Sequence, residues 1–138
     1  MFGLFRRKKV PVGDISAFSF TYTQGCMINS YACYQLNWRD GGYVASVKPV
    51  NEPDAATKVI SVSDEFARKL EKLLTDYQVG KWDGFQKMDQ RIDDGKSFNL
   101  VVLFRDESRI SARGYMRWPK NFRDVKNQII SLFSETIA

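Results

Sequence analysis

A group of carboxylates lies in one stretch of the chain and offers the clearest opportunity for catalysis. Its members are Asp83, Asp89, Asp93 and Asp94. Two neighbouring carboxylates can serve as general acid and general base, so an enzyme working through the segment from Asp83 to Asp94 is one hypothesis. Clustered aspartates in a glycine-containing loop are also typical of turns, which their side chains cap through hydrogen bonds. The pattern favours this capping role.

Other common chemistries are excluded by residue type or by spacing. The chain has no histidine, which excludes Ser-His-Asp and Cys-His catalysis and imidazole metal sites. The aspartate-rich segment also fails the EF-hand pattern for calcium, because counting from Asp89 puts Arg91 third and Leu100 twelfth. Cys26 and Cys33 form no C-x-x-C pair, so we expect neither a metal nor a cofactor. A disulfide between them would suit a hairpin, whereas reduced thiols are typical of the cytoplasm.

A second candidate site lies on the strand predicted over residues 109–116. Because side chains alternate across a strand, one face receives Arg109, Ser111, Arg113, Tyr115 and Arg117. The other face receives Ile110, Ala112, Gly114 and Met116. Guanidinium groups around a ring can stack on bases and bind phosphate, so a weak single-stranded nucleic-acid binder is a second hypothesis. We expect Arg105 to join these arginines from across the turn, beside Val101 and Leu103. The alternative is a solvated face whose arginines keep the sheet edge soluble.

Aromatic residues flank both candidate sites. Trp82 and Phe85 follow the first predicted helix, with Gly84 between them, and we expect the two rings to cover the edge of the core. The functional alternative is one groove that combines rings with a few polar groups, as ligand sites commonly do. Its residues would be Trp82, Phe85, Tyr115 and Trp118, beside Asp83 and Asp94.

Short motifs in the second half of the chain resemble those of a small bacterial domain family. They are W-D-G-F at 82–85, D-G-K-S-F-N-L at 94–100, I-S-A-R-G-Y at 110–115 and P-K-N-F at 119–122. The family shares W-D-G-F, D-G-x-S-F-x-L, and a strand ending in S-A-x-G followed by P-x-x-[FY]. The similarity extends over about residues 14 to 135. The family has no known function, so the resemblance implies a fold and a bacterial source and identifies no catalytic residue.

The basic character of the chain is concentrated at its start. The formal net charge is +5, from 21 lysines and arginines against 16 acids, and four of the 21 form the run Arg6-Arg7-Lys8-Lys9. We therefore interpret residues 1–12 as a basic tail and residues 13–138 as one domain. Rings and a leucine among residues 1–9 predict at most a weak contact with a membrane surface. No signal peptide or apolar span is evident, which predicts a cytoplasmic protein.

Two-residue alternation predicts an antiparallel meander in the first half of the chain. We expect its strands over residues 15–23, 31–38 and 43–50, with Asp40-Gly41-Gly42 as the hairpin turn. A short β-branched run predicts a further strand over residues 58–62. Residues 81–96 are predicted to form a long loop, and alternation resumes in strands over 98–104 and 109–116.

Two amphipathic helices complete the predicted fold. The first is expected to begin after the N-cap Ser63 and to stop at Gly80, and the second to begin after Asn121. The buried stripe of the second helix is expected to be Phe122, Val125, Ile129, Leu132 and Phe133. The order β-β-β-(β)-α-β-β-α predicts an α+β fold. Its single antiparallel sheet would have about five to six strands, with both helices packed on one face.

These observations favour a non-enzymatic binding or interaction module for a protein or a small ligand. The candidate ligand-binding residues are Trp82, Asp83, Phe85, Asp94, Arg113, Tyr115, Arg117 and Trp118. A nucleic-acid binder and an acid/base enzyme follow as second and third hypotheses. The burial or exposure of Trp82 and Trp118 distinguishes core packing from a site lined by rings.

Overall fold

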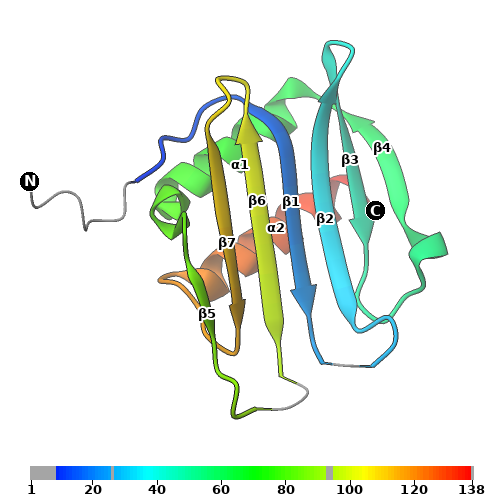
Figure 1. Cartoon of the computed structure of the whole chain (residues 1–138). Coiled ribbons are helices and arrows are strands. Elements are labelled where there is room, and N and C mark those ends of the chain that lie inside the picture. Colours follow the sequence, from blue (N-terminus) through cyan, green and yellow to red (C-terminus); the bar gives the residue numbers. More distant parts are fainter. Residues whose placement is uncertain (1–8, 26, 93–94, 138) are drawn as a thin grey trace, which may run out of the picture.

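The computed structural model describes residues 9–25, 27–92 and 95–137. Within these residues, seven strands form one sheet in the order β4-β3-β2-β1-β6-β7-β5. The strands are β1 Ile15–Thr23, β2 Tyr31–Arg39, β3 Gly42–Lys48, β4 Lys58–Val62, β5 Gln86–Met88, β6 Ser97–Phe104 and β7 Arg109–Tyr115. Helices α1 (Asp64–Asp76) and α2 (Phe122–Thr136) both lie against one face of the sheet and leave the other uncovered (Figure 1). The predictions of an α+β fold, a single sheet and two helices on one of its faces are confirmed, and all of the described strand pairs but one are antiparallel.

The prediction of five to six strands, all antiparallel, is wrong in two respects. β5 is an additional strand, and it pairs with β7 in parallel, Gln86 with Arg113 and Met88 with Tyr115. The sequence predicted a loop here because three exposed residues, Gln-Lys-Met, carry no apolar alternation. A short 3-10 helix, η3 (Val79–Trp82), precedes the strand. β5 thus gives the sheet a short parallel edge beside β7.

β1 occupies the centre of the sheet, where Phe20 pairs with Tyr34 on β2 and with Leu100 on β6. Alternate residues of these strands are buried beneath the helices. The intervening residues lie on the uncovered face, which we call the open face. On the three central strands most of them are small or polar: Ala17, Ser19, Thr21, Cys33, Gln35, Asn37, Ser97 and Asn99. The period of two in the sequence therefore separates a packed face from a polar one.

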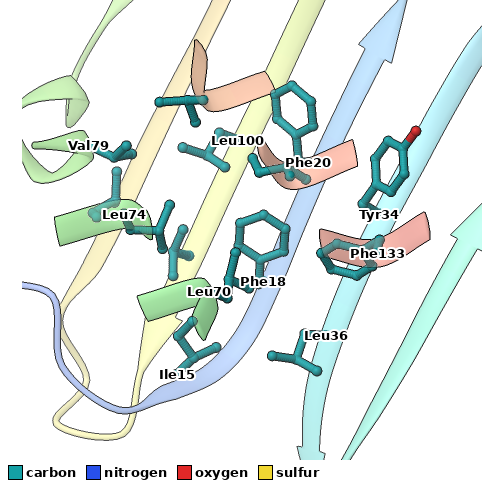
Figure 2. Close-up of a cluster of buried hydrophobic side chains, with 14 of the residues drawn as sticks. Ile15, Phe18, Phe20, Tyr34, Leu36, Leu70, Leu74, Val79, Leu100 and Phe133 are labelled. Atoms are coloured by element: carbon teal, nitrogen blue, oxygen red, sulfur yellow. The ribbon is translucent and has the colours of Figure 1, made fainter. Parts of the chain in front are cut away.

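Rings from α2 and the central strands pack with leucines from α1 to build the core (Figure 2). Phe133 of α2 stacks on Phe18 with ring centroids 6.0 Å apart. It also meets Tyr34 and Phe66 edge-on, at 5.5 and 5.0 Å. Four of the five residues predicted for the buried stripe of α2 are buried, and Leu132 is partly buried. The helical periodicity in the sequence therefore identified the packed face of α2 correctly.

The helix ends differ from those that the sequence suggested. The left-handed residue that follows α1 is Gln78, with a φ of 55°, rather than Gly80. Ser63 and Asn121 occupy the N-cap positions, but neither side chain makes a capping hydrogen bond. Gly80 is required for a close approach instead, because a Cβ there would lie 2.0 Å from the carbonyl oxygen of Val10. Backbone packing, and not helix termination, explains this glycine.

Three groups of residues named in the sequence predictions lie outside the described ranges. They are residues 1–8 of the predicted tail, Cys26, and Asp93 with Asp94. Val10 and Val12, which follow the basic run, pack against the core, and the N–H of Val10 donates to the carbonyl oxygen of Gly80 at 3.1 Å. Cys33 is a half-buried free thiol on β2. The described chain is therefore packed against the domain from Val10 onward.

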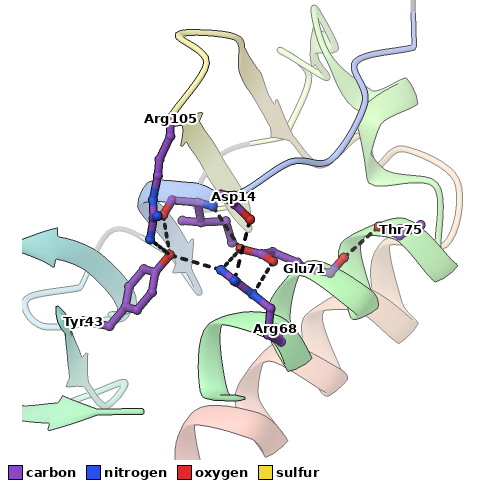
Figure 3. A network of polar contacts seen from close by, with 7 residues as sticks. Asp14, Tyr43, Arg68, Glu71, Thr75 and Arg105 are labelled. Carbon is purple, nitrogen blue, oxygen red and sulfur yellow. Dashed lines mark hydrogen bonds and ion pairs between the residues drawn. The ribbon is translucent and has the colours of Figure 1, made fainter. Parts of the chain in front are cut away.

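A polar network closes the end of the sheet where β1 begins (Figure 3). The buried Tyr43 hydroxyl donates to the carbonyl oxygen of Ile15 at 2.8 Å. It accepts hydrogen bonds from the guanidinium groups of Arg68 at 3.3 Å and Arg105 at 2.9 Å. Glu71 on α1 accepts from the backbone N–H of Ile15 and from Arg68, both at 2.9 Å. One phenol thus connects β3 to the start of β1, to α1 and to the β6–β7 turn.

Candidate functional site

The predicted ring-lined groove does not form, because its aromatic residues lie on different sides of the sheet. Trp82 and Phe85 are only 3% and 7% exposed. The Trp82 ring stacks on Phe122 with centroids 5.9 Å apart. Trp118 is half-buried and stacks on the same ring at 4.6 Å. Tyr115 belongs to the open face, so it does not meet the Trp82 and Trp118 rings in a common groove; of the predicted rings, only Phe85 and Tyr115 line depressions on that face.

The described aspartates of the acidic segment act as hydrogen-bond acceptors that hold the structure around them. Asp83 Oδ1 accepts from the backbone N–H of Ser111 at 2.8 Å and so ties the end of η3 to β7. Asp89 accepts from the backbone N–H of Arg91 at 3.1 Å and from its guanidinium group at 2.9 Å. The contact of Asp89 with the backbone N–H of Arg91 is the turn-capping pattern that clustered aspartates favour. The remaining members, Asp93 and Asp94, lie outside the described residues.

We expect the Asp89 carboxyl to titrate well below the ordinary range for aspartate. Hydrogen bonds from Arg91 favour the ionised form and lower the pKa of Asp89 to about 2. Because this folded-state pKa is lowered, the contact stabilises the fold above the ordinary pKa and its contribution disappears as pH falls toward 2. A carboxyl 13C NMR titration measures the midpoint. Arg91→Ala should raise it toward the ordinary value of about 4, although the backbone N–H of residue 91 remains as a donor; an unchanged midpoint in the variant would contradict this assignment.

β7 presents two different faces, as alternation predicted. Its buried residues are Ile110, Ala112 and Gly114, and its open-face residues are Arg109, Ser111, Arg113 and Tyr115. Arg109 and Arg113 are exposed, whereas Ser111 and Tyr115 are half-buried. The strand ends at Tyr115 because Met116 adopts a φ of 55°, so alternation does not extend to Met116 or Arg117. The predicted arginine face is therefore limited to two arginines on β7.

Arg105 does not join these arginines, and this prediction is wrong. Its guanidinium carbon lies 3.8 Å from the centroid of the Trp38 ring, and the group donates to the Tyr43 hydroxyl. Trp38 and Tyr43 are cross-strand partners whose side chains belong to the helix-covered side. Arg105 follows the end of β6, so strand alternation no longer determines the direction of its side chain. The cation–π contact with Trp38 determines that direction instead.

Two adjoining depressions follow β7 across the open face. They measure about 530 and 520 Å³ and have Gln86, Asn99 and Arg113 in common. The first extends to Met88 and Tyr115 beside β5. The second extends in the other direction and is lined by Asp83, Val101, Arg109 and Ser111. We call the combined depression the β7 groove; Arg113 lies where its two halves meet.

The β7 groove has both polar and apolar lining residues and carries a net positive charge. Three cations line it, at Lys87, Arg109 and Arg113. The described lining contains one carboxylate, Asp83, whose Oδ1 already accepts from Ser111. With the Gln86 amide oriented so that its oxygen faces Arg113, that oxygen accepts hydrogen bonds from the guanidinium group. Two exposed arginine side chains, Arg109 and Arg113, therefore line the groove beside the neutral amides of Gln86 and Asn99, which suits an anionic ligand.

Tyr115 has a structural task in the β7 groove. Its hydroxyl donates to the carbonyl oxygen of Ile92 and accepts from the N–H of Gly95, both at 2.7 Å. The phenol therefore fastens the chain between β5 and β6 to the end of β7. Its hydroxyl is engaged twice, so the exposed guanidinium groups are the principal polar contacts that a ligand meets.

Two groove residues, Gln86 and Asn99, were missed by sequence reasoning. Asn99 pairs with Arg113 across β6 and β7, and Gln86 pairs with Arg113 across β7 and β5. Asn99 could have been found, because alternation in the predicted strand over 98–104 puts it on the face that Arg113 shares. Gln86 carried no such signal, since β5 is too short to show a pattern.

The fold and the groove define an α+β protein with one covered sheet face and one open, cationic face. No protein-family model matches the chain, and no curated protein is significantly similar to it in sequence. The resemblance to a bacterial family of unknown function therefore stays a prediction. Among the helices that the structure describes, none is both long enough and apolar enough to cross a bilayer.

Proposed function

We propose that the protein is a non-enzymatic binding module whose β7 groove holds an extended, acidic segment of a partner protein. One observation carries the proposal: two depressions on the open face meet at Arg113 and continue along the strand from Arg109 to Tyr115. Small-molecule sites are typically enclosed clefts that bury most of the ligand. A groove that runs along an uncovered strand instead provides contacts spaced along a chain.

The lining supplies the contacts that such a segment requires. Arg109 and Arg113 are exposed and can form charge-assisted hydrogen bonds with carboxylates at two points along the groove. Gln86 and Asn99 flank Arg113 on the neighbouring strands and can pair with peptide N–H and C=O groups there. Val101 offers an apolar contact on the floor. Specificity for negative charge would follow from the excess of cations over the one described carboxylate.

Nucleic acid, the second hypothesis, finds fewer of its usual contacts on this face. Single strands are held by exposed rings on which bases stack, together with cations that follow the backbone. Trp82 is buried, and the two predicted rings that line the groove offer little surface for stacking, because Phe85 is almost fully buried and Tyr115 is half-buried. The cations remain, so an oligonucleotide is the appropriate competitor in a binding test.

Binding can be tested with a fluorescein-labelled short peptide of alternating glutamate and threonine, followed by fluorescence anisotropy. We expect this peptide to bind the wild-type protein and its lysine-containing counterpart not to bind. Arg113→Glu should weaken binding at least about tenfold, because it reverses the charge at the centre of the groove. Arg113 is exposed, so the variant should remain folded.

A matched control separates the groove from general charge attraction. Arg39 is also an exposed strand arginine, at the end of β2, and it does not line the groove. Arg39→Glu should therefore leave the peptide affinity within about twofold of wild type. Absence of acidic-peptide binding, or equal weakening by both variants, would overturn the proposal. Salt-sensitive oligonucleotide binding that Arg113→Glu abolishes, without peptide binding, would replace it with the nucleic-acid hypothesis.

A further inference from the structure

A separate depression of about 380 Å³ lies at the end of the sheet where α2 begins, on the helix-covered side. Its lining combines cations with rings: Lys96, Arg123, Lys126, Tyr22, Trp118 and Phe122. The cations come from two parts of the chain, Lys96 just ahead of β6 and the other two from the first turns of α2. None of these residues lines the β7 groove, so the two sites are independent.

The three cations lie together without a compensating acid in the described lining. The ion pairs found among residues 9–25, 27–92 and 95–137 involve Arg68, Lys69, Lys72 and Arg91. Lys96, Arg123 and Lys126 take part in none of them. The pKa of Lys126 is lowered, first because partial burial disfavours the ammonium ion and then because Lys96 and Arg123 repel it. A bound anion would relieve this repulsion and would regain the interaction lost by desolvation.

Rings form the rest of the depression. The Lys126 ammonium lies 4.6 Å from the centroid of the buried Tyr22 ring, which directs the charge over an aromatic face. Trp118 stacks on Phe122 with centroids 4.6 Å apart and an interplanar angle of 28°. Trp118 is half-buried, so part of its indole is available to a ligand. A planar apolar group can therefore lie against the indole while an attached anion meets the cations.

We propose that this depression binds a small molecule in which a phosphate monoester is joined to a planar ring. The dianionic phosphate would lie among Lys96, Arg123 and Lys126, and the ring would pack against Trp118. Phosphate matches three converging cations better than a carboxylate does, because it offers more charge and three acceptor oxygens. The volume is within the range of about 300–1,000 Å³ that is usual for small-ligand sites.

Phenyl phosphate is the simplest probe that carries both features, and isothermal titration calorimetry measures its binding. We expect it to bind at least about fivefold more tightly than inorganic phosphate, which lacks the ring, and than phenol, which lacks the charge. Adenosine monophosphate should compete with it at the same site. Quenching of the tryptophan fluorescence that is lost in Trp118→Phe would report the ring contact, because the chain has two further tryptophans.

Substitutions of the cations that line the depression test where phenyl phosphate binds. Arg123→Gln removes an exposed cation that the core does not use, and Lys126→Gln removes the half-buried one. Each substitution should weaken the binding of phenyl phosphate at least about fivefold. Lys120 is an exposed neighbour outside the depression, so Lys120→Gln should leave this binding unchanged. Arg113→Glu should also leave phenyl phosphate binding unchanged, so failure here is distinguishable from failure of the peptide site. No binding at millimolar ligand, or equal weakening by Lys120→Gln, would overturn the proposal.

Discussion

Phe133→Ala is expected to lower the free energy of unfolding by about 4 kcal/mol, the largest effect of any single side chain considered. Phe133 is fully buried and contacts three other elements of the fold. Its ring packs against Phe18 on β1, Tyr34 on β2 and Phe66 on α1. Removing it leaves a cavity that rigid neighbouring rings cannot fill, so the lost burial adds to the cost of the void.

Urea denaturation followed by circular dichroism measures this loss. Ser134→Ala provides the matched control, because Ser134 is the exposed neighbour of Phe133 on the same helix. This substitution should change the free energy of unfolding by no more than about 0.5 kcal/mol. A loss below about 1 kcal/mol for Phe133→Ala would show that α2 is held to the sheet by other contacts.

Gly114→Ala is expected to cost about 3 kcal/mol even though it adds only one methyl group. An added Cβ would lie 2.2 Å from the carbonyl oxygen of Arg117 and 2.8 Å from the Phe98 ring. Gly114 pairs with Phe98 on one side and Lys87 on the other, so β7 is held between β6 and β5 and cannot shift freely. The methyl group must therefore displace backbone.

Gly13→Ala tests whether the effect comes from crowding or from the change of residue type. No atom lies within 4 Å of a Cβ placed at Gly13, so its stability should change by less than about 0.5 kcal/mol. Equal urea midpoints for Gly114→Ala and wild type would mean that the turn after β7 accommodates the methyl group. That outcome would contradict the close packing of β5, β6 and β7 described above.

The sequence was informative wherever burial imposed a period on it. β1 and β4 begin and end at the predicted residues, because apolar alternation and β-branched residues are strong local signals. β5 was missed because it forms by pairing with β7, which follows it in the chain. Its three exposed residues show no apolar alternation that would indicate a strand. Gly80 was interpreted as a helix stop because a glycine fits either role, and the approach of Val10 is a tertiary contact.

The candidate sites show the same difference between local sequence signals, which can be predicted, and tertiary contacts, which cannot. Alternation placed Arg109 and Arg113 on the open face, since a strand dictates side-chain direction. It gave no guidance for Arg105, which lies beyond the end of β6 and turns to the Trp38 ring. The phosphate site was not predicted either, because it combines Lys96 with residues of α2 that are distant in sequence. Only the fold brings those charges together.

The central position of β1 has a consequence for how the protein is made. β1 leaves the ribosome before every other strand, yet Phe20 pairs with Leu100, which is synthesised much later. Until β6 emerges, the nascent chain can complete only β1 to β4 with α1, and one long edge of β1 remains unpaired. An unpaired apolar edge is prone to associate with other chains. Slow translation before β6 would therefore favour aggregation, and a chaperone that covers this edge would improve the yield of folded protein.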